Sequence, residues 1–446
     1  TQAWFGSMND IREIVLELLA QLGSSREARQ YLKEFSSVEK TRFAVVKAGG
    51  GILRDHLDEL ASALAFLHRL GLRPVVLHGA GPQVDEALAQ AGVESQRRDG
   101  LRVTTEEVMA VARPVVYAQN LRLVEALEAR GIRARGIQHG VFRCRLLDRD
   151  RFGLVGEVVS VELEALSSAV RGEALPVLTC LGESDAGQVL NINADVAARE
   201  LVWAVKPHKI VFLTPSRGLL DRDGRIISAI SLDNDYETLI AQPWVHSGMR
   251  LKLQQINEML ARLDRSTSVS ITSADQLARE LFTYRGAGTL VRRGEAIELI
   301  EKPAPEMLAK VADQVERAFE KQLKPEWAES LADPTILMSQ SSRAAAVVTR
   351  GLEAVPYLDK FAVTPDAQGE GLAAAMWQVL RAHFPVFYWR SRNANPITNW
   401  YFQQADASFR SGPWVVFTIG IEDPQLRERV IHDGLARDSG WSEAPA

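Results

Sequence analysis

The sequence predicts an α/β fold: a mainly parallel sheet flanked by helices, followed by a smaller α+β unit. In the first half, buried strands alternate with glycine turns and amphipathic helices, as in "FAVVKAGGG" and "RPVVLHGAGP". In the last third, strand-like runs such as "AAAVVT", "VFYWRS" and "WVVFTIG" crowd together with few helices between them. At 446 residues the chain is long for one hydrophobic core, so more than one domain is expected.

Four segments follow from composition and periodicity. An N-terminal helical arm is expected over residues 8–40, because apolar residues recur on one helical face of "DIREIVLELLAQL". The parallel sheet is expected over residues 41–300. A linker is expected at residues 301–306, "EKPAPE", where two prolines stand in a charged stretch. The α+β unit then occupies residues 307–446.

Composition narrows the class of protein. The net charge of −5 and sequence pI near 6.0 argue against broad nucleic-acid binding, which requires clustered positive charge. No apolar run reaches the roughly 18–20 residues that span a bilayer. Cys144 and Cys180 lack the paired spacing of a zinc site, and no metal site is expected. Two free thiols without a recognisable secretory segment predict a cytoplasmic protein.

Two glycine-rich turns form the first candidate phosphate site. Gly49 and Gly50 follow one predicted strand, and Gly79 and Gly81 follow the next. The carboxyl ends of parallel strands meet at one edge of a sheet, where ligands bind. Without a Cβ, glycine lets backbone N–H groups approach an anion closely. Many such segments are only tight turns, so this pattern alone has low specificity.

Charged and polar residues accompany these turns. Lys47 stands just before the first turn, and Lys252 lies near the start of the helix expected at "SGMRLKLQQI". Asn191 and Asp195, in "NINADVAARE", are four residues apart and share a helical face if the helix has already begun. Taken singly, each of these residues is also compatible with an ordinary surface position.

Together the segments resemble the amino acid kinase family, and within it the acetylglutamate kinases, over residues 41–295. The resemblance rests on the order and spacing of "VVKAGGG", "PVVLHGAGPQVD", "RDGLRVT", "NINADVAA" and "SGMRLKL". It implies a three-layer sandwich and phosphorylation of the side-chain carboxylate of N-acetylglutamate by ATP, with Mg²⁺ carried by the nucleotide. Two departures are Ala80, where a glycine is common, and residues 213–221, "LTPSRGLLD", which lack the acidic residue that usually follows the threonine near the nucleotide.

The resemblance implies a role for each candidate residue of this unit. Lys47 and Lys252 flank the transferring phosphoryl group, Asp195 positions the lysines, and the amides of the two glycine turns hold phosphoryl oxygens. Arg102 and Asn191 bind the acetylated amino acid, Arg102 through a carboxylate. A carboxylate nucleophile is already ionised near pH 7, so no general base is required.

His78, which precedes the second turn, is expected to position that turn rather than to catalyse.

The second candidate phosphate site is "QGEGLA", residues 368–373, with Gln368, Gly369, Gly371 and Ala373. It matches the Q-x-x-G-x-G/A loop of the GNAT acetyltransferase superfamily, which binds the pyrophosphate of acetyl-CoA. A dinucleotide-binding fold is disfavoured, because no acidic residue stands where such a fold places its ribose ligand.

Residues 306–440 as a whole resemble the acetyltransferase domain of vertebrate-type acetylglutamate synthases. By this resemblance Lys360 and Arg390 bind the carboxylates of L-glutamate, and Asn395 and Tyr401 lie at the reacting centre. A tyrosine hydroxyl is a suitable proton donor to the departing thiolate. Tyr401 is expected in a strand, with its ring pointing away from both aromatic neighbours.

Over the whole chain the resemblance is to the bifunctional acetylglutamate synthase/kinases of bacteria. It implies acetylation of L-glutamate and phosphorylation of N-acetylglutamate, the first two steps of arginine biosynthesis. Two alternatives stay open: a synthase whose first domain only senses arginine, and a non-enzymatic amino-acid-binding regulator. Residues 280–291, "ELFTYRGAGTLV", resemble the arginine-binding segment of arginine-sensitive acetylglutamate kinases, so L-arginine is expected to inhibit. The resemblance also implies a homotetramer.

Overall fold

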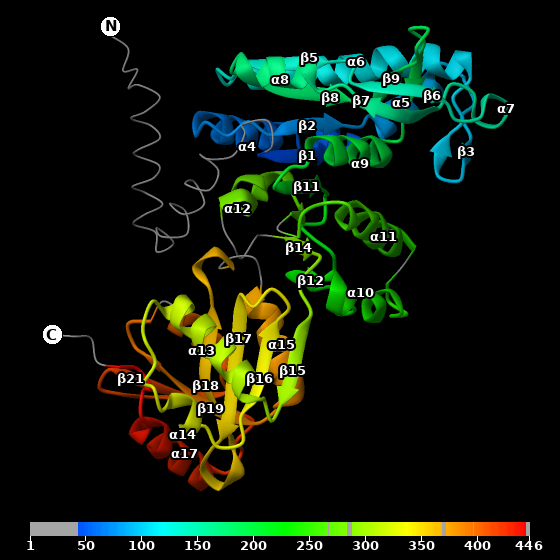
Figure 1. The fold of residues 1–446 in the computed structure, drawn as a ribbon. Coiled ribbons are helices and arrows are strands. Elements are labelled where there is room, and N and C mark those ends of the chain that lie inside the picture. Colours follow the sequence, from blue (N-terminus) through cyan, green and yellow to red (C-terminus); the bar gives the residue numbers. More distant parts are fainter. Residues whose placement is uncertain are drawn as a thin grey trace, which may run out of the picture. The chain divides into compact units, whose positions relative to one another are not determined.

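The protein divides into two compact units, with the boundary between Arg293 and Gly294 (Figure 1). The computed structural model describes residues 43–245, 247–265, 267–282, 288–367, 372–395 and 397–442. The helical arm predicted for residues 8–40 lies outside the described residues.

The first unit is built on an eight-stranded sheet. Its neighbouring strands run parallel, apart from the antiparallel pair β13 and β14, so the prediction of a mainly parallel sheet is confirmed. In spatial order the strands are β12 (Ala229–Ser231), β14 (Thr289–Arg292), β13 (Ser268–Thr272), β11 (Lys209–Leu213), β1 (Ala44–Ala48), β2 (Val75–His78), β8 (Leu175–Thr179) and β5 (Ala134–Ile137).

Helices cover both faces of this sheet and make it the middle layer of three. Side chains alternate along β1, so Ala44, Val46 and Ala48 enter one hydrophobic core while Val45 enters the other. By the same alternation Lys47 shares the face of Val45. The helices that pack on the face of Ala44, Val46 and Ala48 are α3 (Gly50–Asp55), α4 (Leu57–Arg69), α6 (Glu106–Glu128) and α12 (Leu277–Phe282). Those that pack on the face of Val45 are α8 (Glu164–Arg171), α9 (Ala194–Val205), α10 (Leu232–Ile240) and α11 (Ser247–Ala261).

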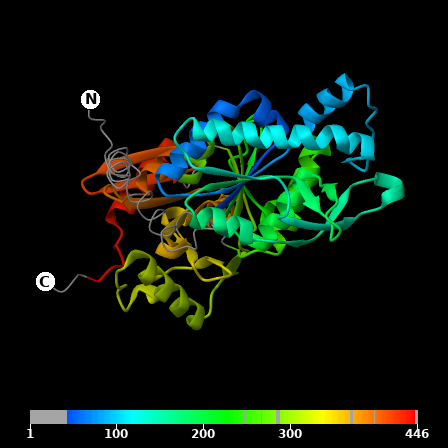
Figure 2. The ribbon, with the colours of Figure 1, turned by 90° about the horizontal axis from the view of Figure 1, so that it is seen from above.

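Smaller elements complete the unit. Figure 2 shows the long helix α6, in cyan, running along one side of it. Helix α5 (Gly81–Gln90) packs against α6 around Val84 and Leu88. The remaining elements are the hairpin β3 (Arg97–Arg98) and β4 (Leu101–Arg102), helix α7 (Arg149–Phe152), and the sheet of β10 (Val189–Asn191), β9 (Leu181–Glu183), β6 (Phe142–Leu146) and β7 (Gly156–Val161).

The second unit contains a seven-stranded, mostly antiparallel sheet. In spatial order its strands are β15 (Ile297–Glu301), β16 (Thr335–Ser339), β17 (Ala344–Arg350), β18 (Pro356–Val363), β19 (Phe387–Arg392), β21 (Trp414–Ile419) and β20 (Ala407–Ser411). Its helices are α13 (Pro305–Phe319), α14 (Trp327–Ser330), α15 (Leu372–His383), α16 (Thr398–Gln404) and α17 (Pro424–Ala436).

Strands β18 and β19 run parallel and pair over a short length. Their register joins Tyr357 to Tyr388 and Leu358 to Trp389. In the part of the chain that the structure describes, this pairing does not continue toward Lys360 and Arg390. Backbone N–H and C=O groups beyond the paired residues require other hydrogen-bond partners. The end of the pairing between β18 and β19 therefore favours a ligand site between these two strands.

Several helices begin at a side chain that satisfies first-turn N–H groups. Thr105 caps α6 by accepting from Val108, and Asn193 caps α9 by accepting from Asp195 and Val196. These are the residue types favoured at helix N-termini, so the sequence itself fixes where α6 and α9 start.

The domain boundary differs from the linker predicted at residues 301–306. Residues Ile297–Glu301 form β15, which hydrogen-bonds with β16 along its full length and so belongs to the second unit. Pro305 opens α13, a position where proline is favoured because its missing N–H is not needed. The prolines taken as a linker signal therefore mark a helix start.

Cys144 and Cys180 are free and buried. Among the described residues, no helix combines the length and apolar character required to cross a bilayer.

Candidate functional sites

The two predicted glycine turns of the first unit meet at the carboxyl ends of β1 and β2. The amide of Gly79 donates to the carbonyl of Ala48 at 3.0 Å. A Cβ added at Gly50 would lie 2.9 Å from the amide nitrogen of Gly81, and one added at Gly79 would lie 3.3 Å from the Cβ of Ala194. Gly50 and Gly79 therefore allow the backbone of these turns and the start of α9 to come together.

Gly49 and Gly81 carry no comparable steric requirement. A Cβ at either position would meet nothing within 4 Å among the described atoms. Gly49 precedes α3 and Gly81 opens α5, so each stands at a helix N-terminus, where backbone N–H groups lack intrahelical partners.

Three predicted charged residues cluster beside these turns. The Nζ of Lys47 donates to Oδ1 of Asp195 at 2.7 Å. Burial lowers the pKa of Lys252, the charge of Lys47 lowers it further, and Asp195 opposes both effects. The three charges therefore act on one another across β1, α9 and α11, and the first turn of α9 adds its positive end to the same place.

Asn191 differs from the sequence expectation in its local structure. It ends β10, and α9 begins at Ala194, so Asn191 and Asp195 do not share a helical face. The capping side chain of Asn193 separates strand from helix. The four-residue spacing was therefore coincidental.

The structure still joins Asn191 to Arg102, through a residue that the sequence analysis missed. The amide of Asn191 donates to the hydroxyl of Thr104 at 3.0 Å, and that hydroxyl donates to the carbonyl of Arg102 at 2.9 Å. Thr104 is fully buried. Thr104 stands two residues after Arg102 in "GLRVT", and this position in the motif is the sequence feature that could have identified it.

The departures from the family pattern have local explanations. Ala80 precedes α5 with a negative φ and is buried against Val84 and Leu88, so an alanine fits there. Within residues 213–221, Arg217 pairs with Asp275 at 3.2 Å. Asp275, which follows β13, thus pairs with this segment.

In the second unit, Gln368, Gly369 and Gly371 of the predicted pyrophosphate loop lie outside the described residues. Ala373 is described. It lies in the first turn of α15 and packs against the hydrophobic core between that helix and the sheet. The predicted succession of strand β18 and helix α15 around the loop is confirmed.

The strand predicted around Tyr401 is wrong. Residues Thr398–Gln404 form helix α16. The ring of Tyr401 does not point away from Trp400, because their centroids lie 5.6 Å apart. It packs into an aromatic cluster with Trp389 at 5.4 Å and Trp377 at 5.8 Å. Burial raises the pKa of Tyr401, which keeps its phenol neutral.

Lys360 and Arg390 stand on separate strands just past the end of the β18–β19 pairing. The ammonium of Lys360 donates to Asp359 at 2.7 Å and lies over the rings of Trp327 and Trp441. The guanidinium of Arg390 stacks on Trp414 at 4.1 Å and donates to carbonyl oxygens at the end of α17. Both cations are held in fixed positions by aromatic faces and oxygen acceptors.

Asn395 has a local structural task. Its side-chain oxygen accepts from the amide of Ile397 at 3.3 Å, and its carbonyl accepts from the amide of Thr398 at 3.0 Å. Asn395 therefore shapes the turn that leads from β19 into α16, which carries Tyr401.

Comparison with known proteins assigns both units. Residues 42–273 match the model of the "Amino acid kinase family". This chain belongs to the amino acid kinase family. Residues 299–435 match the model of "NAT, N-acetyltransferase, of N-acetylglutamate synthase". The first unit is referred to below as the amino acid kinase unit and the second as the NAT unit.

Similar proteins cover nearly the whole chain. The chain is 46% identical to an acetylglutamate kinase of Xylella fastidiosa over 92% of its own length and 98% of that protein. It is 38% identical to "Protein arg-6, mitochondrial" of Neurospora crassa over 95% of its length and 49% of that protein. Human "N-acetylglutamate synthase, mitochondrial" is 29% identical over 93% of this chain and 76% of its own.

A solved structure shares the fold. N-acetylglutamate synthase from Neisseria gonorrhoeae, complexed with coenzyme A and N-acetyl-glutamate, superposes with a TM-score of 0.62. The match covers 89% of this chain and 98% of that one at 21% sequence identity. The predicted amino acid kinase sandwich followed by a GNAT acetyltransferase is therefore confirmed as the fold class.

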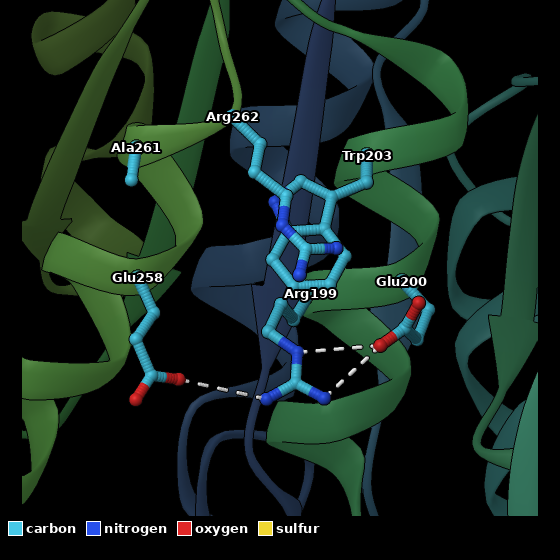
Figure 3. Close-up of a pocket in the computed structure, with 6 residues that line it drawn as sticks. All are labelled: Arg199, Glu200, Trp203, Glu258, Ala261 and Arg262. Atoms are coloured by element: carbon cyan, nitrogen blue, oxygen red, sulfur yellow. Dashed lines mark hydrogen bonds and ion pairs between the residues drawn. The ribbon is translucent and has the colours of Figure 1, made fainter.

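A pocket of about 510 Å³ lies further along α9 and α11 of the amino acid kinase unit. Figure 3 shows the guanidinium of Arg262 over the ring of Trp203, at 4.0 Å, and Arg199 paired with Glu200 and Glu258. None of the predicted site residues lines this pocket. It is therefore distinct from the cluster of Lys47, Asp195 and Lys252.

His78 of the amino acid kinase unit is fully buried at the end of β2. Its Nε2 lies 3.1 Å from the amide nitrogen of Asn120, which also donates to the carbonyl of Val177. Burial lowers the pKa of His78 to about 4, so the ring is neutral near pH 7. This contact joins α6 to β2 and β8 beneath the second glycine turn, as expected of a positioning residue.

His78 makes stability depend on pH. The unfolded chain takes up a proton near pH 6.5, whereas the folded state resists it until about pH 4, so stability is lost as pH falls between these values. The full loss is about 3 kcal/mol. The free energy of unfolding, measured with denaturant at pH 7 and at pH 4.5, should differ less between the two pH values for His78→Gln than for the wild type. If this free energy changed equally with pH in both proteins, the pH dependence of stability would arise from groups other than His78.

Proposed function

We propose that the chain transfers an acetyl group from acetyl-CoA to L-glutamate in the NAT unit, and a phosphoryl group from ATP to N-acetylglutamate in the amino acid kinase unit. The observation that carries the proposal is the pairing of Lys47 with Asp195, at 2.7 Å, beside Lys252 and the glycine turns. A unit that only senses an amino acid has no need of such a cluster of charges. The 46% identity to an acetylglutamate kinase supports the same substrate.

The phosphoryl transfer requires charge neutralisation and positioning. A carboxylate oxygen of N-acetylglutamate attacks the γ-phosphorus of ATP, the new O–P bond forms, and the bond to ADP breaks. No proton is transferred. Lys47 and Lys252 offset the negative charge of the phosphoryl oxygens, and Asp195 holds Lys47 in place. The N–H groups at the starts of α3 and α5, next to the crowded Gly50 and Gly79, are proposed to hold the same oxygens, whereas the N–H of Gly79 itself donates to Ala48.

Magnesium is proposed as a companion of ATP rather than a resident ion. Within the ranges that the structure describes, no group of three or more His, Cys, Asp or Glu side chains is arranged to hold a metal ion. Mg²⁺ is commonly bound through nucleotide phosphates with few protein ligands.

The acetyl transfer requires a neutral amine and a protonated leaving group. The amine nitrogen of glutamate attacks the thioester carbonyl, a C–N bond forms, and the C–S bond breaks. The amine proton leaves to water, the thiolate of coenzyme A takes a proton from the hydroxyl of Tyr401, and the resulting phenolate regains a proton from water. Burial raises the pKa of Tyr401, so the phenol is neutral near pH 7 and carries a proton that it can donate. Lys360 and Arg390 are proposed to bind the carboxylates of glutamate.

L-Arginine is proposed as an inhibitor that binds near residues 280–291. The Nζ of Lys209, which is buried, donates to the carbonyl of Glu280, and a carboxylate oxygen of Glu280 accepts from the amide of Gly288 at 3.2 Å. Residues 283–287 lie outside the described residues. The Neisseria gonorrhoeae synthase was also solved with L-arginine.

A homotetramer remains a proposal from the family resemblance. Closed symmetry is the expectation for such an assembly.

Removing one charge from the lysine cluster tests the kinase proposal. Lys252→Ala should lower the rate of N-acetylglutamate phosphorylation about 10²–10³-fold, because a fixed charge is lost where negative charge develops. Acetyl transfer should change little. Arg250→Ala, which removes an exposed charge from the same helix, is the matched control. A kinase rate that survives Lys252→Ala would exclude Lys252 from phosphoryl transfer.

Deleting one hydroxyl tests the acetyltransferase proposal. Tyr401→Phe keeps the packed ring and removes only the proposed proton donor, so acetyl transfer should fall about 10²–10⁴-fold. Acetyl-CoA affinity and phosphorylation of supplied N-acetylglutamate should both hold. Acetyl transfer at the wild-type rate would leave Tyr401 as a packing residue.

Titration calorimetry tests the arginine proposal. L-Arginine should bind the wild type at millimolar concentration or below and should lower enzymatic activity, because an effector must favour one global state to act at a distance. L-Lysine, which lacks the planar guanidinium, serves as the comparison ligand. Absence of a binding isotherm for arginine would remove it as an effector.

A further inference from the structure

Arg102 carries a positive charge that is almost removed from water, with 9% of the residue exposed. A buried guanidinium requires an anionic or hydrogen-bonding partner, since an uncompensated charge in such a place is strongly destabilising. Its NH1 lies 2.6 Å from Oδ1 of Asp85 and donates to the hydroxyl of Ser95 at 2.9 Å. Its NH2 donates to the carbonyl of Gly81 at 3.4 Å.

Asp85 is therefore the counter-charge of Arg102 when no substrate is bound. It lies on α5, one turn after the glycine that opens that helix. Its second oxygen, Oδ2, lies 3.1 Å from NH2 of Arg97. Burial favours the neutral acid, but the hydrogen bond and charge of Arg102, followed by those of Arg97, lower the pKa of Asp85. Each carboxylate oxygen is thus held by a different guanidinium.

The guanidinium of Arg102 keeps two N–H donors for a ligand, the one on Nε and one of the two on NH2. Its contacts use NH1 and NH2, and among the described residues no acceptor receives a hydrogen bond from Nε. The backbone of Arg102 is fixed independently, through Thr104 to Asn191. The side chain is therefore oriented by Asp85 on one side while a further edge remains for a carboxylate.

We propose that Asp85 is a positioning residue for N-acetylglutamate: it fixes the side chain of Arg102 before binding, and Arg97 retains Asp85 when the substrate carboxylate shares Arg102. This inference rests on the proposed kinase function. It assigns Asp85 no part in phosphoryl transfer itself, because its contacts lead to Arg102 and Arg97 and not to the lysine cluster. Its contribution is to substrate affinity, through a guanidinium that is already oriented.

The test separates affinity from turnover. Asp85→Asn keeps the shape of the side chain and removes its charge, so Arg102 loses its counter-charge. The KM for N-acetylglutamate should rise about tenfold or more, the effect of one charge-assisted hydrogen bond. The kcat and the KM for ATP should stay within about threefold of wild type. Asp85→Glu should recover part of the affinity, and Arg97→Ala should raise the same KM less than Asp85→Asn.

Glu86→Gln is the matched control, because Glu86 is an exposed acidic residue next to Asp85 on the same helix. An unchanged KM for N-acetylglutamate in Asp85→Asn would overturn the inference. So would an equal change in kcat and in both KM values, which would indicate a general structural defect. Thermal unfolding of each variant identifies a variant that does not fold, in which case Asp85→Glu and Arg97→Ala decide the question.

Calorimetric binding of N-acetylglutamate distinguishes this inference from the function on which it rests. Wild type that binds N-acetylglutamate without phosphorylating it contradicts the proposed kinase, and the affinities of wild type and Asp85→Asn then still decide the role of Asp85. Wild type that neither binds nor phosphorylates N-acetylglutamate contradicts both.

Discussion

The ion pair between Lys47 and Asp195 is the interaction on which the proposed phosphoryl-transfer site depends. It joins the carboxyl end of β1 to the first turn of α9 at 2.7 Å, and Lys252 adds its charge from α11. The pair forms because Lys47 alternates onto the sheet face that α9 covers. Had β1 been shifted by one residue, the lysine would face the opposite helix layer.

Close backbone approach is the second requirement of that site. A Cβ added at Gly79 would lie 3.3 Å from the Cβ of Ala194 at the start of α9, and one added at Gly50 would lie 2.9 Å from the amide nitrogen of Gly81. The two glycine turns thereby meet at the start of α9, where Asp195 pairs with Lys47. The NAT unit differs in this respect. Among its described residues, the parallel pairing of β18 with β19 ends after Leu358 and Trp389, so the two strands are not hydrogen-bonded to each other beyond that point.

The sequence predicted the succession of strands, glycine turns and helices at the start of the first unit and several strands of the second, and its errors have physical causes. The linker at residues 301–306 was misplaced because prolines also open helices, as Pro305 does. Tyr401 was assigned to a strand because aromatic runs favour strands, yet tertiary packing against Trp389 and Trp377 accommodates it on α16. The spacing of Asn191 and Asp195 suggested one helical face although a cap residue lies between them.

By itself, the sequence determined the periodicity of the strands and helices, the two glycine turns, and the lysines and aspartate that accompany the first of them. These are local features, carried by side-chain spacing and by the absence of a Cβ. Only the tertiary structure decided which distant residues meet: Asn120 with His78, Thr104 with Asn191, and Asp85 with Arg102. Such partners are set by how separate elements pack, and a single sequence records the spacing within an element but not the distance between elements.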